Sequence, residues 1–361
     1  MPILEINLRK IRHNAKLLKN LLAQRNVSII GITKLVLGNP TIAMTLVQGG
    51  IEYLGDSRIN NIIKMKKKNI RAQFVLIRIP TITEIPLVVK YANYSLNSEL
   101  KTIRMLSNEA TQQKKIHNII LMVDMGDLRE GINTFNIEYF VEEILKLKNI
   151  NLSGIGTNFK CFGGIIPTDE NMNEFSKLVF RIKDKFELEL EFVSGGNSAN
   201  FNWFKSCKNI GEINNFRIGE AMFLGKETIN YEPIPNLFTD AFKLITEIVE
   251  LKQRSVIPKG IIVSNAFGER VQTYHKKINN GKKSDIIRTQ ALLNIGRQDI
   301  AVRGLTPKES VNILGASSDY LVVDIRDNQF QIGQKLHFDL NYEALLRAMT
   351  SPYIHKKFID I

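Results

Sequence analysis

The chain has 361 residues, 44% of them hydrophobic, and a formal net charge of +13. This size and composition predict an ordinary folded protein with one large domain and a smaller second one, and exclude a disordered chain. No apolar run approaches the roughly 20 residues of a membrane-spanning helix, and two cysteines, Cys161 and Cys207, are too few for a disulfide framework or a cysteine-rich zinc site.

The N-terminus and the distribution of charge indicate where the protein is located and which kinds of partner it lacks. Residues 1–6 contain no basic stretch followed by an apolar core, so we expect a cytoplasmic protein. The lysines are scattered or lie in short runs such as 66–68, and they do not gather on one face with aromatic residues. A solvated basic surface explains the charge, and no nucleic-acid, membrane or metal partner is predicted.

Apolar runs of strand length alternate with amphipathic segments of helix length over the first 230 residues or so. A helix is predicted over 8–22, and the run from Val27 to Lys34 forms the first strand of the repeat. Seven more strands are predicted at 52–56, 73–80, 94–97, 118–125, 151–158, 190–196 and 215–219. The clearest helices between them are predicted at 40–48, 99–113, 135–148 and 171–186.

Eight strands, most of them followed by a helix, are the count and spacing of a (β/α)₈ barrel. A doubly wound open sheet would also alternate strands and helices, but it needs no eighth unit and usually has a glycine-rich fingerprint after its first strand. No such fingerprint lies between Lys34 and Asn39. We therefore predict an α/β fold in which residues 9–228 form a TIM barrel.

The sequence changes character after Pro233 and Pro235. Strands are predicted at 240–252, 286–297, 311–325 and 330–338 with no long helix between them, and the lysine-rich stretch 276–283 is predicted to be an exposed hairpin loop. These patterns predict a mainly β C-terminal domain over 229–361. Residues 3–8 form a strand that either domain could hold, and 1–8 are grouped with the second domain.

Active sites of such barrels lie at the carboxyl ends of the strands. The polar or glycine residues at these ends are Lys34, Asp56, Ser57, Arg58, Arg78, Asn97, Asp124, Arg129, Asn158, Asn197, Ser198, Arg217 and Gly219. A lysine here could be an amine nucleophile, and the turns at 194–198 and 217–219 have the composition of a phosphate pocket. The combination indicates a phosphorylated carbonyl cofactor such as pyridoxal phosphate.

Each signal also has a plainer interpretation. A lysine after a strand is usually a solvated turn residue, and Gly-Gly-Asn-Ser is more often a simple turn than a phosphate site. Arg129 and Arg217 could pair with carboxylates such as Asp124 and Glu220. The shared placement at strand ends favours a site.

Several motifs extend the pattern along the chain. They are residues 4–8 with 11–14, Ile32-Thr33-Lys34, the segment 123–131, Asn197-Ser198, Arg217-Ile218-Gly219-Glu220, and 349–353 near the C-terminus. Together they resemble the alanine racemase-like, fold type III pyridoxal phosphate enzymes, and within that family the ornithine racemase branch. The resemblance covers nearly the whole chain.

The resemblance implies that Lys34 binds the aldehyde of pyridoxal 5′-phosphate as a Schiff base and serves as one proton-transfer base. It implies that Arg129 meets the substrate carboxylate and the phenolic oxygen of the cofactor. Arg217 would face the pyridine nitrogen, which stays unprotonated because an arginine does not readily give up its proton. The other cofactor contacts implied are Asn158, Asn197, Ser198, Gly219, Glu220 and Tyr353.

Three positions depart from the alanine racemase pattern. Gly38, Asn158 and Phe267 stand where alanine racemases have a tyrosine, a histidine and the tyrosine that acts as second base. Racemisation needs proton donors on both faces of the α-carbon. Asp319, which resembles a rim motif from the partner subunit, is the predicted second base, with Cys161 as the alternative. Asp319 could equally be a turn carboxylate, and Cys161 a small core residue.

We therefore predict a pyridoxal phosphate-dependent amino-acid racemase, an isomerase, that interconverts the L and D forms of a basic amino acid, with ornithine favoured. It would work as a homodimer with active sites at the interface. Asp127, or else Glu130, would hold the second amine of the substrate, although both could be solvated loop charges. An alanine or broad-specificity racemase, a diamino-acid decarboxylase and a non-catalytic cofactor carrier remain alternatives.

Overall fold

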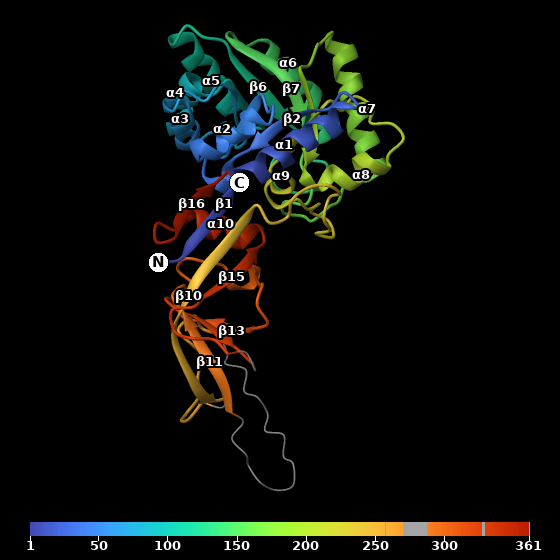
Figure 1. The fold of residues 1–361 in the computed structure, drawn as a ribbon. Coiled ribbons are helices and arrows are strands. Elements are labelled where there is room, and N and C mark those ends of the chain that lie inside the picture. The colour runs from blue at the N-terminus through green and yellow to red at the C-terminus, as the bar shows by residue number, and fades with distance from the viewer. Residues whose placement is uncertain (257, 270–286, 327–328, 361) are drawn as a thin grey trace. The chain divides into compact units, whose positions relative to one another are not determined.

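The structure is a computed structural model that describes residues 1–256, 258–269, 287–326 and 329–360. The described chain forms two compact units (Figure 1). One contains Asn7–Ala241 together with Asp360, and the other contains Met1–Ile6 and Phe242–Ile359. The first unit extends past the expected limit at 228 because residues 226–241 fold back onto it: Ile234 N donates to Gly225 O at 2.9 Å, and the side chain of Asn14 bonds both backbone groups of Phe238.

The first unit is a closed parallel barrel in which the eight strands are neighbours in chain order. The strands are β2 (Ser28–Ile32), β3 (Tyr53–Asp56), β4 (Gln73–Leu76), β5 (Tyr94–Asn97), β6 (His117–Met122), β7 (Ile150–Gly156), β8 (Phe192–Asn197) and β9 (Asn215–Ile218). The last strand pairs with the first, with Arg217 opposite Ile30, and this pairing closes the barrel. The prediction of a (β/α)₈ barrel is confirmed, and the doubly wound sheet is excluded.

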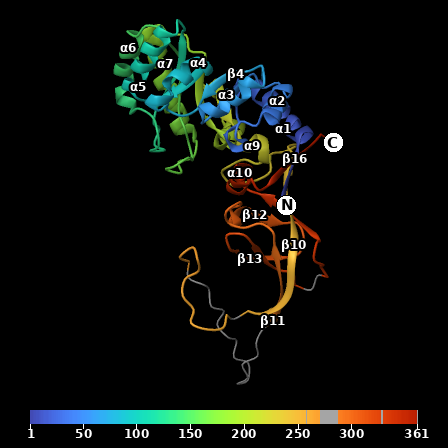
Figure 2. The same ribbon diagram turned by 90° about the vertical axis from the view of Figure 1, so that its left-hand side faces the viewer.

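Helices cover the outside of the barrel (Figures 1 and 2). They are α1 (Leu8–Ala23), α2 (Pro40–Gln48), α3 (Ile59–Lys67), α4 (Ile85–Tyr91), α5 (Leu100–Gln112), α6 (Ile137–Leu145), α7 (Asp169–Phe186), α8 (Phe201–Ser206) and α9 (Glu220–Leu224). The start of α2 follows capping rules, since the Asn39 side chain accepts from Thr41 N at 3.0 Å and Pro40 is the first helical residue.

Side chains fill the barrel in layers. A buried apolar cluster contains Ile30, Ile32, Val75, Tyr94, Leu96, Ile120, Met122 and Phe192. Because side chains alternate along a strand, Ser194 follows Phe192 on the inward row of β8. Arg217 of β9 meets Ser194 there, with Nη1 donating to Ser194 Oγ at 2.6 Å. The inner layer toward the carboxyl ends of these strands is therefore polar.

The second unit is mainly β, as predicted. An antiparallel sheet runs in the order β12-β15-β10-β11-β14-β13, and β1 joins both β10 and β16. Its elements are β1 (Ile3–Asn7), β10 (Phe242–Ser255), β11 (Ile287–Leu293), β12 (Leu305–Pro307), β13 (Asn312–Ala316), β14 (Leu321–Asp324), β15 (Lys335–Leu340), α10 (Tyr342–Thr350) and β16 (His355–Ile359). The two longest strands, β10 and β11, lie side by side in both views (Figures 1 and 2).

Two expectations for this unit need correction. The single strand expected at 311–325 is the hairpin β13 and β14, because Ser317 N donates to Tyr320 O at 2.9 Å and closes a turn. Helix α10 and strand β16 were not expected at all. The hairpin loop expected at 276–283 lies outside the described residues.

Within the described ranges, no helix is both long and apolar enough to cross a bilayer. The same residues contain no group of three histidine, cysteine or carboxylate side chains that could hold a metal ion.

Candidate active site

Polar residues from five strand ends meet at one edge of the barrel. Lys34 follows β2, Arg129 and Glu130 follow β6, and Asn158 follows β7. Asn197 ends β8 and is followed by Ser198, while Arg217 lies in β9 and is followed by Gly219 and Glu220. Parallel strands of one barrel carry their carboxyl ends to the same edge, so these predicted residues lie in one unit. Asp319 and Tyr353 belong to the other unit.

Lys34 opens a short 3₁₀ turn after β2. The preceding residue, Thr33, is buried and donates from Oγ1 to Asp56 Oδ2 at 2.7 Å. Asp56 in turn accepts from the backbone N of Arg58 at 3.0 Å, so a buried carboxylate anchors the start of the turn. Burial lowers the pKa of the Lys34 amine, and the nearby Arg129 guanidinium lowers it too, against the opposite effect of Glu130. More of the amine is then neutral and nucleophilic.

Arg217 is 5% exposed and fills the polar layer of the barrel. Its Nη2 donates to Thr157 O at 2.5 Å and to Asn158 Oδ1 at 2.7 Å. Space for the guanidinium comes from Gly156, where a β-carbon would lie 3.4 Å from Nη1 of Arg217 and 3.1 Å from the Met122 sulfur. Burial lowers the pKa of Arg217 to about 10, so the side chain remains a cation near neutral pH.

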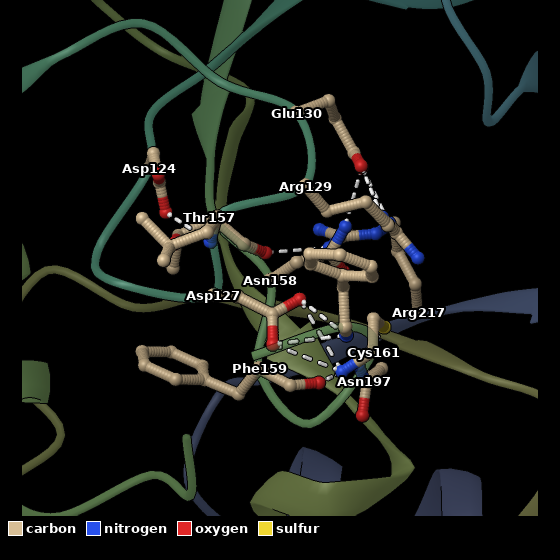
Figure 3. A network of polar contacts seen from close by, with 12 residues as sticks. Asp124, Asp127, Arg129, Glu130, Thr157, Asn158, Phe159, Cys161, Asn197 and Arg217 are labelled. Carbon is tan, nitrogen blue, oxygen red and sulfur yellow. Dashed lines mark hydrogen bonds and ion pairs between the residues drawn. The ribbon is translucent and has the colours of Figure 1, made fainter. Parts of the chain in front are cut away.

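Arg129 is joined to Arg217 through two other side chains (Figure 3). Nε and Nη2 of Arg129 both donate to the carboxylate of Glu130. Glu130 Oε1 also accepts from Asn158 Nδ2 at 2.6 Å, and Asn158 Oδ1 accepts from Arg217. The plainer interpretation of ion pairing is confirmed for Arg129, although its carboxylate partner is Glu130 and not Asp124. Among the described residues, Arg217 bonds only uncharged groups and does not pair with Glu220.

Asp127 has a different environment from the one expected. It is 2% exposed, and its carboxylate accepts from the backbone N of Cys161 at 3.0 Å and of Phe162 at 3.2 Å (Figure 3). The carboxylate therefore fastens the loop after β6 to the loop after β7. Cys161 is exposed as a residue, but the protein around its thiol keeps water away from part of the sulfur, and this desolvation raises the thiol pKa. Asn197 Nδ2 lies 3.5 Å from the Cys161 sulfur and donates to Phe159 O at 2.8 Å.

Ser198 and the start of α9 lie together after β8 and β9. The buried Ser198 Oγ accepts from Ala221 N at 3.3 Å. The first N–H groups of a helix have no partner within it, which suits an anion. Glu220, the first residue of α9, is partly buried, and this burial raises the pKa of its carboxyl to about 7.

The remaining predicted residues lie in the second unit. Asp319 is exposed in the turn between β13 and β14, where it accepts from Ser318 Oγ at 2.9 Å. Tyr353 is 65% exposed and follows α10. Phe267 is 45% exposed and packs against Arg297, whose guanidinium carbon lies 4.3 Å from the ring centroid.

Two sets of contacts were not predicted from the sequence. They are the hydrogen bonds from Arg217 to Ser194 and Thr157, and the link from Arg217 through Asn158 to Glu130. The inward row of β8 was a usable signal for Ser194, since it follows Phe192 by two positions. Thr157 acts through its backbone carbonyl, and no side-chain pattern could identify it.

The closed βα barrel has three features at the carboxyl edge of its strands: a desolvated lysine, a buried arginine and the start of a helix. These features are typical of a barrel enzyme that uses an amine nucleophile. The model of the alanine racemase N-terminal domain matches residues 6–227. The chain is 37% identical to the ornithine racemase of Acetoanaerobium sticklandii, over 99% of both chains. It is also 37% identical to the lysine racemase of Thermotoga maritima, over 99% of this chain and 98% of that one.

Solved structures agree on the fold. The alanine racemase of Clostridium difficile 630 superimposes with a TM-score of 0.73 at 19% identity, covering 99% of this chain and 96% of that chain. A D-threonine aldolase from Filomicrobium marinum gives 0.73 at 13% identity, covering 97% and 89%. The chain therefore belongs to the alanine racemase family. It is an amino-acid racemase, and its cofactor is pyridoxal 5′-phosphate.

The residues at the barrel edge fit that cofactor. Lys34 would supply an amine for the aldehyde, and Arg217, which has no acidic partner among the described residues, would supply a proton donor for the ring nitrogen. Ser198 and the start of α9 suit the phosphate group. In the described part of the chain, the Thr157 hydroxyl is buried without a hydrogen-bond partner, so one polar atom beside Arg217 is open to further contact.

Proposed function

We propose that this racemase acts on a basic amino acid and that ornithine is its substrate. The observation that carries the proposal is the match to an ornithine racemase and a lysine racemase along essentially the whole length of all three chains. Both named substrates have a second amine on the side chain. Similarity over both domains supports a shared substrate class.

Lys34 is the proposed covalent attachment point of the cofactor and one of the two proton-transfer bases. The bound cofactor supplies an electron sink for the α-carbanion of the substrate. The desolvated environment of Lys34 favours the neutral amine, which can take up the α-proton. Arg217 would donate to the ring nitrogen and leave it unprotonated. That arrangement limits electron withdrawal and favours return of the proton over transamination.

Ser198, with the backbone of Gly219 and Glu220, is proposed to bind the phosphate, with Asn197, Asn158 and Tyr353 as further contacts. The hydrogen bond from Arg217 to Asn158 Oδ1 supports this assignment for Asn158. Arg129 is proposed to bind the substrate carboxylate. In the described chain its Nη1 has no hydrogen-bond partner, while Nε and Nη2 are held by Glu130.

The second base is proposed to be Asp319, contributed by the partner subunit of a homodimer. The motif around it resembles the rim of the family, and its carboxylate is exposed on a turn. Cys161, in the loop after β7, is the competing candidate. Asp127, proposed to hold the second amine of the substrate, would have to do so while both its oxygens accept from backbone N–H groups.

The experiment is incubation of the cofactor-loaded protein with L-ornithine, L-lysine and L-alanine in deuterated water, followed by chiral chromatography and mass spectrometry. The proposal predicts inversion with incorporation of one deuterium for ornithine, faster than for alanine. Exchange on alanine alone would refute the basic substrate, and it would favour an alanine racemase.

A further inference from the structure

Glu130 connects the two arginines of the candidate active site (Figure 3). Its carboxylate accepts from Nε and Nη2 of Arg129, and its Oε1 also accepts from Asn158 Nδ2 at 2.6 Å. The other end of the same amide, Asn158 Oδ1, accepts from Arg217 Nη2 at 2.7 Å. The Glu130 side chain is 19% exposed and Arg217 is 5% exposed, so most of this network is shielded from water.

The charges at its two ends fix the orientation of the Asn158 amide. In the reverse orientation the Nδ2 donor would face the Arg217 guanidinium, and Oδ1 would face the Glu130 carboxylate. Both contacts would be repulsive, because a guanidinium has only donors and a carboxylate has only acceptors. The amide is therefore aligned by Glu130 on one side and in turn aligns Arg217 on the other.

In the part of the chain that the structure describes, Arg217 has no direct counterion. Its hydrogen-bond partners are the hydroxyl and carbonyl of Ser194, the carbonyl of Thr157 and the amide oxygen of Asn158, all of them uncharged. A buried cation without a negative charge nearby is costly. Burial lowers the pKa of Arg217, and the charge of Glu130 is the strongest of the effects that oppose this. Glu130 thus balances Arg217 without touching it, and balances Arg129 by direct contact.

We propose that Glu130 is a positioning residue that sets the orientation and charge of Arg217 through Asn158, while it holds Arg129 in place for the substrate carboxylate. The inference rests on the functions proposed above for the two arginines. It also gives Glu130 a role other than binding the second amine of the substrate, since its oxygens are already engaged by Arg129 and Asn158. Because an amide does not titrate, the link through Asn158 keeps its polarity across the physiological pH range.

The test is the full-length variant Glu130→Gln, loaded with cofactor. Glutamine keeps an acceptor for Asn158 and removes the negative charge. We expect a changed absorbance spectrum of the bound cofactor and a fall in kcat of about 10- to 100-fold, the range given by loss of a hydrogen bond to a charged group. KM should rise by a similar factor for ornithine, lysine and alanine, because Arg129 loses its charged partner and all three substrates present the same carboxylate. The matched control is Glu143→Gln, which breaks an exposed pair with Arg104 and should leave spectrum and kcat as in the wild type.

A second variant separates positioning from general damage. In Glu130→Gln/Asn158→Asp the negative charge moves one side chain closer to Arg217. Recovery of the wild-type spectrum in this double variant supports the inference. A spectrum that stays wild-type in Glu130→Gln, with KM raised for ornithine and lysine but not alanine, would overturn it and make Glu130 the ligand of the second amine.

The two proposals can fail separately. If the wild-type protein racemises alanine and not ornithine, the proposed substrate is wrong, yet the spectra of the two variants still decide the role of Glu130. If the Glu130→Gln spectrum and kcat both equal those of Glu143→Gln, the positioning role is refuted whatever the substrate.

Discussion

Replacement of Glu220 by glutamine should stabilise the cofactor-free protein at alkaline but not at acidic pH. Glu220 begins α9 and is partly buried, and burial raises the pKa of its carboxyl from 4.5 to about 7. In the unfolded chain the group titrates near 4.5. The folded state therefore binds more protons between these values, and stability falls as the pH rises through this interval. Above about pH 7 the carboxyl is ionised in both states, and its cost to stability no longer changes with pH.

The size of the effect follows from the same interval. One pKa unit is worth about 1.4 kcal/mol, so a change from 4.5 to about 7 corresponds to an upper limit of roughly 3 kcal/mol. Because Glu220 is not fully enclosed, water screens part of this, and about 1 to 3 kcal/mol is expected at pH 8. The advantage of the glutamine variant should be small near pH 5 and vanish below it.

Urea unfolding of the cofactor-free protein at pH 5 and pH 8, followed by circular dichroism, measures this difference. The control is Glu189→Gln, at an exposed position before β8, which should give the same small difference at both pH values. If the free energy gained by Glu220→Gln is equal at pH 5 and pH 8, the carboxyl is not strained by burial and the reasoning is refuted.

Three further predictions concern the barrel edge. Borohydride reduction followed by mass spectrometry should find the cofactor attached to Lys34. The variant Lys34→Ala should abolish attachment, whereas the control Lys64→Ala, on α3, should preserve it. Attachment to another residue would refute the assignment. Gly156→Ala should destabilise the protein by about 1 to 3 kcal/mol and weaken cofactor binding, because the new methyl group would lie 3.1 Å from the Met122 sulfur and 3.4 Å from Arg217 Nη1; unchanged thermal unfolding and cofactor titration would contradict this. Asp319→Asn should abolish exchange from one enantiomer of ornithine and spare the other, whereas the same result from Cys161→Ala would transfer the role of second base to the thiol.

The barrel could be predicted because its strands are short apolar runs and its helices are amphipathic, so both periods are visible locally. Lys34 and Arg217 could be located by the same logic, since each lies at a strand end. The second unit was harder. The turn that separates β13 from β14 contains Ser317, Ser318 and Asp319, a run of turn-forming residues that marks the reversal but was included in one long predicted strand. Helix α10 lies beyond the last predicted strand, in a stretch to which no element was assigned.

The contacts within the site depended on long-range geometry. Asp127 stands two positions before Arg129, which suggested a shared pocket, but its partners Cys161 and Phe162 lie 34 and 35 positions away on another loop. Asn158 could be placed after its strand, yet the direction of its amide depends on two charges from other strands. The position of a polar side chain along its strand can be predicted from the sequence. Its orientation toward side chains from other strands depends on how the barrel packs.

The pairing of β2 with β9 has a consequence for the order in which this protein becomes functional. Lys34 is made early in synthesis, whereas Arg217 is made 183 residues later, and the two strands become neighbours only when the barrel closes. Before the barrel closes, Lys34 is exposed to water and its amine stays protonated, as in an unfolded chain. Capture of the aldehyde at neutral pH should thus report completed closure, and a nascent or half-folded chain should be protected from indiscriminate reaction with carbonyl metabolites.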